Sequence, residues 1–147
     1  MNEKQRRVAW ALLIGLIVVM MGAQITADTI TEQDDDGLTR AEVNDRLSAE
    51  AEELNAGLPM MFDEHTRLLS VMALDRRMVY RYGLPNFDRY DVDVDVFREE
   101  MKAYLVNRYC TAPGSEFYRD NNVDFNHLYE KEDGTSIFEI AIHNPEC

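Results

Sequence analysis

The sequence has few of the residues that build catalytic and metal sites. Among its 147 residues are two cysteines, three histidines and only four serines. The histidines are His65, His127 and His143, and no two of them have the i, i+4 helical spacing of a zinc site. No serine lies in a nucleophile-elbow motif. No motif therefore indicates a zinc enzyme or a serine hydrolase, and we expect no cofactor.

Basic residues are scarce after the N-terminus. The chain beyond Ala27 has 27 acidic and 12 basic residues, a formal net charge of −15. Such a charge repels the phosphate backbone of nucleic acids and the surface of anionic lipids, so we expect no nucleic-acid partner. The charge keeps an exported domain soluble, and it is also compatible with a basic protein partner or with cations.

Charge is absent from a long run near the N-terminus. The basic stretch Met1–Arg7 precedes the 18 residues Val8–Ile25, which carry no charge and have no polar helical face. A spanning helix needs about 17–25 mostly apolar residues, and positive charge stays on the cytoplasmic side. The sequence therefore predicts a single membrane segment at Val8–Ile25. The protein would lie in a bacterial inner membrane, with its N-terminus in the cytoplasm and its C-terminal domain in the periplasm.

Two fates of this N-terminal segment stay open. Ile25-Thr26-Ala27 is a passable cleavage site, although isoleucine is a poorer first residue than alanine. The segment is thus a retained signal anchor or a signal peptide removed after Ala27, which would release the protein into the periplasm. Residues 1–27 form this signal, residues 28–37 an acidic linker, and residues 38–147 one domain of ordinary size.

The two cysteines, Cys110 and Cys147, both follow the apolar segment. In an oxidising compartment an even pair usually closes into a disulfide. Metal binding would require suitably spaced histidines, and a redox-active pair is normally close in sequence, as in C-x-x-C. We therefore expect a structural disulfide between Cys110 and Cys147, which would stabilise the fold by about 3–4 kcal/mol.

Helical periodicity predicts two helices in the domain. Thr39 and Glu42 have the spacing of a capping box that begins the first helix, and Gly57 followed by Pro59 ends it. Apolar residues that recur at intervals of three and four predict a second helix over Asp93–Tyr109.

Alternating apolar residues predict strands in the remaining segments, and a short turn or helical turn is expected over 115–120. The expected strands cover 66–73, 77–84, 123–130 and 135–143. They pair into two hairpins, each of which follows one of the helices. Two amphipathic hairpins cannot bury their apolar faces alone. We therefore expect an α+β domain in which one four-stranded antiparallel sheet is covered by two helices.

An acidic ladder resembles the start of a calcium loop. It consists of Asp91, Asp93 and Asp95. An EF-hand loop also requires glycine at its sixth position and glutamate at its twelfth, where this chain has Val96 and Lys102. Aspartates that complement the positive end of the following helix explain the ladder without a metal.

A spaced pattern covers about two thirds of the chain. It reads N-x-x-L-P-x-x-x-D-x-x-T-R-L-x-S-V from Asn55 to Val71, then Y-x-Y from Tyr80 to Tyr82, then paired cysteines around a Y-x-x-x-D-G hairpin that begins at Tyr129. This pattern resembles a group of small exported bacterial envelope proteins of unassigned activity. The resemblance implies export, a disulfide and a sheet, but it implies no mechanism.

The most distinctive part of this pattern is the segment from Pro59 to Arg67. Within it, Pro59, Asp63, Thr66 and Arg67 are candidates for a recognition loop. Alternatively, Asp63 and Arg67 clamp the loop and have a structural role.

These features favour a membrane-anchored periplasmic interaction or accessory protein whose partner is another protein of the envelope. It would be an accessory subunit, or an inhibitor that neutralises a partner through an acidic face. The competing interpretation is a small envelope enzyme or a cation-binding domain that uses scattered carboxylates with His127 or His143. No residue is predicted to be catalytic.

Overall fold

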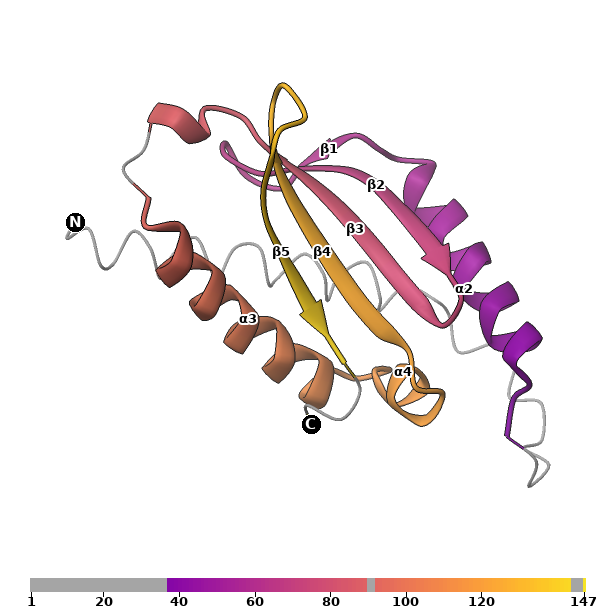
Figure 1. The fold of residues 1–147 in the computed structure, drawn as a ribbon. Coiled ribbons are helices and arrows are strands. Elements are labelled where there is room, and N and C mark those ends of the chain that lie inside the picture. The colour runs from indigo at the N-terminus through magenta and orange to yellow at the C-terminus, as the bar shows by residue number, and fades with distance from the viewer. Residues whose placement is uncertain (1–36, 90–91, 144–146) are drawn as a thin grey trace.

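The computed structural model describes residues 37–89, 92–143 and 147 (Figure 1). Its elements follow the chain in this order: α2 (Arg40–Asn55), β1 (Met60–Met61), β2 (Arg67–Leu74), β3 (Arg77–Leu84), the 3-10 helix η1 (Phe87–Arg89), α3 (Val94–Thr111), α4 (Glu116–Asp120), β4 (Asp124–Lys131) and β5 (Ser136–Ile142). The two predicted helices and four predicted strands all form, within a few residues of the expected bounds.

The sheet has five strands in the order β1-β2-β3-β4-β5, and it is mixed. The prediction of a four-stranded antiparallel sheet is therefore wrong. β3 and β4 are parallel, whereas every other neighbouring pair is antiparallel. The reason is the connection between them, because α3 carries the chain back to the end of the sheet where β3 began (Figure 1). A strand that follows such a helical crossover runs in the same direction as the strand before it.

The fifth strand and the third helix are both short. β1 contains only Met60 and Met61, which are too few residues to show alternation, so the sequence did not predict it. The five residues of α4 occupy the segment where a turn or helical turn was expected. The described residues thus contain three α-helices, and the predicted number of two is wrong.

Both long helices begin at the predicted caps. The Thr39 hydroxyl accepts a hydrogen bond from the Glu42 amide, and the Glu42 carboxylate accepts one from the Thr39 amide at 2.8 Å. Asp93 caps α3, and its carboxylate accepts from the amides of Asp95 and Val96 at 3.2 Å each. The capping role predicted for the aspartate ladder is confirmed for Asp93, while Asp91 lies outside the described residues.

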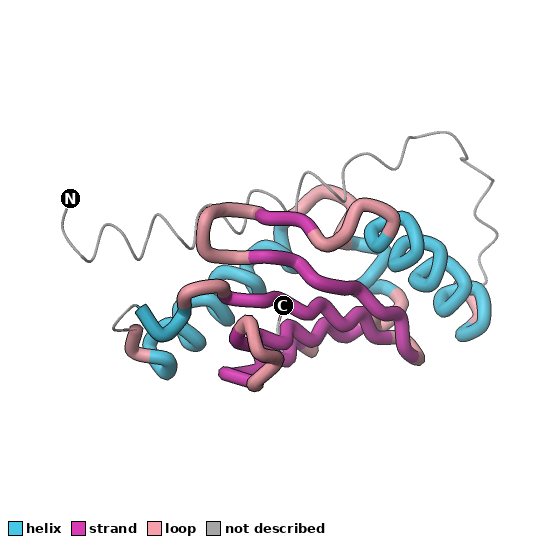
Figure 2. The backbone as a smooth tube through the Cα atoms, turned by 90° about the horizontal axis from the view of Figure 1, so that it is seen from above, coloured by secondary structure: helices cyan, strands magenta, loops and turns pink. Residues whose placement is uncertain are grey.

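The core lies on one face of the sheet. α2 packs mainly against β2 and α3 against β5, and Figure 2 shows the two helices at opposite flanks of the strands. Between them, one row of paired residues crosses the sheet from β2 to β5, and all four are buried: Val71, Tyr80, His127 and Ile140. The helices add Val43, Leu47, Ala51, Met101 and Leu105 to the same cluster. Because both helices cover the same face, the opposite face carries most of the polar residues of the strands.

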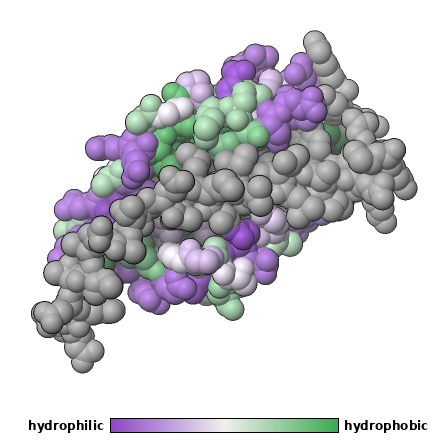
Figure 3. Space-filling model, turned by 180° about the vertical axis from the view of Figure 1, so that it is seen from behind, coloured by the Kyte–Doolittle hydropathy of each residue, from purple (hydrophilic) through white to green (hydrophobic). Residues whose placement is uncertain are grey.

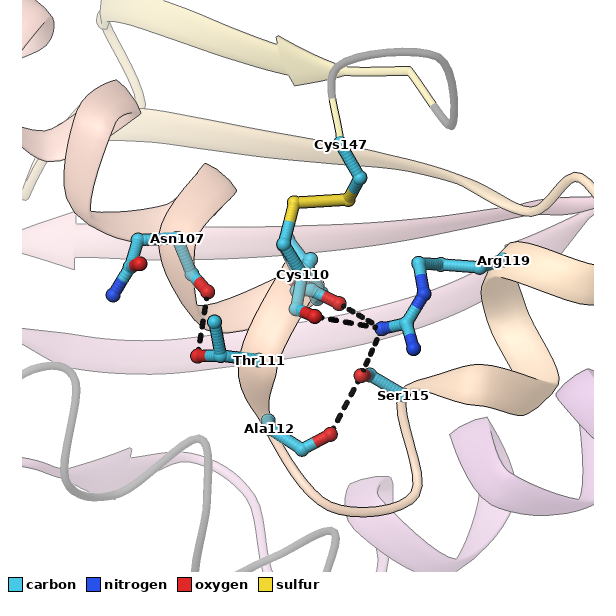
Figure 4. The surroundings of a disulfide bond; sticks show 8 residues. Asn107, Cys110, Thr111, Ala112, Ser115, Arg119 and Cys147 are labelled. Atoms are coloured by element: carbon cyan, nitrogen blue, oxygen red, sulfur yellow. Dashed lines mark hydrogen bonds between the residues drawn. A yellow bond between two sulfur atoms is a disulfide. The ribbon is translucent and has the colours of Figure 1, made fainter.

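A disulfide joins Cys110, in the last turn of α3, to Cys147 across a sequence separation of 37 residues (Figure 4). Arg119 of α4 points toward the same turn, and its Nη1 donates to the carbonyl oxygens of Tyr109 at 2.8 Å and Cys110 at 3.2 Å. The C-terminal end of α3 is therefore held by a covalent bond and by a guanidinium.

The predicted membrane segment Val8–Ile25 lies outside the described residues. Within the described ranges, no helix combines the length and the apolar character that a membrane span requires.

Candidate protein-binding surface around β1

The predicted recognition loop follows directly from the end of α2. The stretch Leu54–Phe62 contains no charged residue, although 29% of the chain is charged. α2 ends at Asn55, and two residues of β1 then pair with β2, with Met60 opposite Leu68 and Met61 opposite Arg67. The uncharged stretch thus crosses from the helix to the edge of the sheet.

The loop between β1 and β2 is fixed to the body of the domain. The Phe62 amide donates a hydrogen bond to the Thr66 carbonyl at 2.9 Å, which closes the loop. The Phe62 ring lies 6.1 Å from the ring of Tyr82, whose side chain is buried. One side of the segment is therefore anchored in the core, and the other side faces outward.

We call residues Leu58–Phe62 the β1 surface. Pro59 is exposed, Met61 is 44% exposed, and the remaining members are half-buried. Figure 3, seen from behind, shows hydrophobic side chains gathered in the upper part of this view. Exposed apolar residues that lie together mark protein-binding sites, and flexible methionine side chains adapt well to a partner.

The four recognition-loop candidates do not share one environment. Pro59 is exposed and Arg67 is half-buried, with its Nε 3.2 Å from the Met61 sulfur. Thr66 is 0% exposed, so it cannot touch a partner. Asp63 accepts a hydrogen bond from the His65 amide at 2.7 Å, which holds the loop in shape. Pro59 is thus exposed and Asp63 and Arg67 are half-buried, and the role of these three residues in recognition stays a prediction.

The predicted clamp between Asp63 and Arg67 does not form as an ion pair among the described residues. Asp63 instead braces the backbone of its own loop, and Arg67 covers Met61. Exposed acids flank the β1 surface on both sides, namely Glu52 and Glu53 before it and Glu64 after it. A partner that fits this arrangement would present an apolar centre with a basic rim.

The two histidines named for the enzyme interpretation, His127 and His143, have different environments. His127 is buried and stands opposite Ile140 in the sheet, not opposite His143. Its Nδ1 lies 3.2 Å from the Tyr82 hydroxyl and its Nε2 lies 2.9 Å from the Tyr109 hydroxyl. Burial lowers the pKa of His127 to about 3, so the ring is neutral at pH 7. It bridges two tyrosines inside the core, where no substrate can reach it.

His143 is exposed, and its Nδ1 lies 3.2 Å from a carboxylate oxygen of Asp124. Asp95, the last member of the aspartate ladder, pairs with Arg98 at 2.8 Å. Across the described part of the chain, no group of three or more histidine, cysteine or acidic residues is placed to hold a metal ion.

Sequence reasoning did not single out Met61. It selected Pro59 and three polar or charged residues of the loop, whereas the exposed side chains also include Met61. The available signal was the absence of charge from Leu54 to Phe62 in so acidic a chain.

Comparison with known proteins places the fold but no family. No protein-family model matches the sequence, and no curated protein matches it. Three solved structures share the fold. A protein of Pseudomonas aeruginosa described as secreted has a TM-score of 0.62 at 11% identity, covering 76% of this chain and 98% of that one.

The other two structures are pilotins. The pilotin of the Vibrio vulnificus type 2 secretion system has a TM-score of 0.60 at 15% identity. The type II secretion system pilotin of Vibrio cholerae has a TM-score of 0.54 at 11% identity. In each case the match covers 74% of this chain and 94% of that one. The described domain therefore has the fold of these pilotins and of the secreted protein.

Proposed function

We propose that this chain is an exported envelope protein that binds a protein partner through the β1 surface. The observation that carries the proposal is the exposed Met61 on an edge strand, within an uncharged stretch of a strongly acidic domain. Phe62 anchors the stretch against Tyr82, so the exposed side chains are presented from a fixed support. Such pre-organisation lowers the entropy lost on binding.

Two further observations support an envelope location. The disulfide between Cys110 and Cys147 is typical of proteins that fold in an oxidising compartment. The structures with this fold include a protein described as secreted and two secretion-system pilotins. By analogy, the partner proposed here is a component of an envelope assembly. The predicted anchor at Val8–Ile25 contributes nothing to this proposal.

The chain offers a matched pair of methionines for the decisive test. Met61 on β1 is 44% exposed and Met72 on β2 is 43% exposed. We expect Met61→Lys to reduce capture of the partner by crosslinking and pull-down from native membranes at least tenfold, because it places a charge in the apolar centre. Met72→Lys introduces the same charge at equal exposure and should leave capture unchanged. Equal capture by both variants would exclude the β1 surface.

Deletion of the protein separates an accessory subunit from an inhibitor. Both would use an apolar surface with an acidic rim, and capture of either kind of partner should weaken as salt screens the rim. Deleting the protein should lower the activity of a partner that it assists and raise the activity of a partner that it inhibits.

Export itself is tested independently. We expect a reporter fused after Cys147 to be active only in the periplasm. Cys110 and Cys147 should resist alkylation until the protein is reduced. A reporter active only in the cytoplasm, together with two free thiols, would contradict the proposal.

A further inference from the structure

One edge of the sheet is incompletely covered by strands. β1 is the outermost strand, and it pairs only with Arg67 and Leu68 of β2. Among the residues that the structure describes, the rest of β2, as far as Leu74, has no strand on that side. α2 lies there instead, and it makes most of its contacts with β2.

Asn55, the last residue of α2, makes the two hydrogen bonds that a neighbouring strand would make. Its Nδ2 donates to the carbonyl oxygen of Val71 at 2.6 Å, and its Oδ1 accepts from the amide of Val71 at 2.9 Å. In an antiparallel pair, one residue exchanges both backbone bonds with the residue opposite. The asparagine side chain therefore occupies the position of a strand at Val71.

A second asparagine, nearer the start of the helix, contacts the turn after β2. The Asn44 Oδ1 accepts from the Arg76 amide at 2.9 Å, and its Nδ2 donates to the Asp75 carboxylate at 3.2 Å. The two amides thus contact the middle of β2 and the turn that follows the strand.

The sequence of β2 explains why its edge needs a cover. Leu68–Leu74 reads LLSVMAL, seven residues without charge, proline or glycine. Met72 is 43% exposed and Leu74 is 53% exposed. Segments of this composition pair readily with identical segments when their edge is free. The other long strands each carry charge, whereas β2 has none after Arg67.

We propose that Asn55 prevents β2 from pairing with β2 of a second copy of this chain. Identical uncharged segments can align antiparallel without placing like charges opposite one another, which would otherwise disfavour pairing. The remainder of the domain is strongly acidic and repels its own copies, so this edge is the place where self-association can begin. Native proteins commonly block exposed edges in comparable ways.

Light scattering coupled to size exclusion, over a concentration series, tests this role. We expect Asn55→Ala to associate with a dissociation constant at least tenfold below that of a control, Asn126→Ala. The control removes a half-buried asparagine that bonds to Glu139 elsewhere on the sheet. Adding Met72→Lys to Asn55→Ala should restore the monomer, because a lysine on an edge strand disfavours its pairing with a second copy.

Asn55→Asp distinguishes edge pairing from general destabilisation. The aspartate loses the bond to the Val71 carbonyl but leaves a negative charge at the edge, so it should stay monomeric. If Asn55→Asp associates as strongly as Asn55→Ala, or if Met72→Lys fails to restore the monomer, the proposal is overturned. A folded, monomeric Asn55→Ala also overturns it. If alanine prevents folding, Asn55→Ser provides the same comparison, since serine cannot reach both backbone groups of Val71.

Discussion

The long helix is held in place by different interactions in the two halves of the domain. In the N-terminal half, the side-chain amide of Asn55 binds α2 to β2, and that of Asn44 binds α2 to the turn after β2. In the C-terminal half, α3 is held by the disulfide of Cys110 and by hydrogen bonds from Arg119. A disulfide acts largely by restricting the unfolded chain, whereas amide contacts exist only once the helix has packed. The attachment of α3 therefore depends on redox conditions, and the attachment of α2 does not.

The halves meet in a polar centre within the core. His127 of β4 bridges Tyr82 of β3 and Tyr109 of α3. Nearby, the Tyr118 hydroxyl of α4 contacts both carboxylate oxygens of Glu50 of α2, at 2.7 and 2.8 Å. These contacts join segments from opposite halves, so changes in them report on the packing of one half against the other.

The largest expected effect comes from removing the disulfide that holds α3. Replacing Cys110 and Cys147 with serine should lower the free energy of unfolding by about 4 kcal/mol, given the length of the closed loop. Urea denaturation of the oxidised protein and of the double variant measures this loss. Hydrogen exchange should rise most at the end of α3. Reductant should shift the wild type but not the double variant, and an unshifted wild type would contradict the prediction.

The free energy of unfolding should depend on pH through His127. Its folded pKa, about 3, lies below the ordinary value of 6.5 because the ring is buried. Between these values the unfolded chain binds a proton that the folded chain does not. Stability should therefore fall as pH drops below 6.5, by up to about 1.4 kcal/mol per pH unit. Urea denaturation at pH 7, 6 and 5 measures this slope.

The variant His127→Gln should flatten that pH dependence, since glutamine does not titrate. The exposed His143 provides the control, and His143→Gln should keep the wild-type slope. Parallel slopes for wild type and His127→Gln would show that His127 is not the group responsible.

A smaller effect is expected from removing one of the hydrogen bonds that hold α2. Asn44→Ala removes the acceptor for the Arg76 amide, and the loss of such a hydrogen bond costs about 1 kcal/mol. Hydrogen exchange should accelerate at Arg76 while the amides of β4 and β5 keep their protection. Equal acceleration of exchange in both halves would show that the two halves do not open independently.

The smallest effect is expected at Glu50. Burial raises the pKa of Glu50, an effect that the hydroxyl of Tyr118 partly offsets. The folded carboxyl then holds a proton to higher pH than the unfolded one, so stability should fall as pH rises above 4.5. Glu50→Gln keeps an acceptor for Tyr118 and should be more stable than wild type at pH 7. Thermal unfolding of this variant beside the exposed Glu52→Gln measures the difference, which should vanish near pH 4.

Prediction from sequence succeeded where the signal was local. The cap at Thr39, the cap at Asp93 and the alternation in four strands depend on residues a few positions apart. It failed for the direction of β4, because a helical crossover and a pair of hairpins have the same order of elements. Which one forms depends on how α3 packs, and the strand sequences do not encode that directly.

The candidate site was predicted only in part. The sequence offered Pro59, Asp63, Thr66 and Arg67 as candidates for a recognition loop, which stays a prediction, and the structure buries Thr66. Met61 was overlooked because an apolar residue in a loop is not distinguished by sequence from a core residue. Only the pairing of β1 with β2 places it at the edge of the sheet.

By itself, the sequence determined the charge of the domain, the extent of its longer helices and strands and the presence of one cysteine pair, since each follows from composition or from neighbouring residues. The tertiary structure alone decided that His127 would meet Tyr82, 45 residues away, and that Asn55 would meet Val71, 16 residues away. Such contacts arise only when separate elements pack together, because the short-range spacing of side chains carries no information about which element will lie beside another.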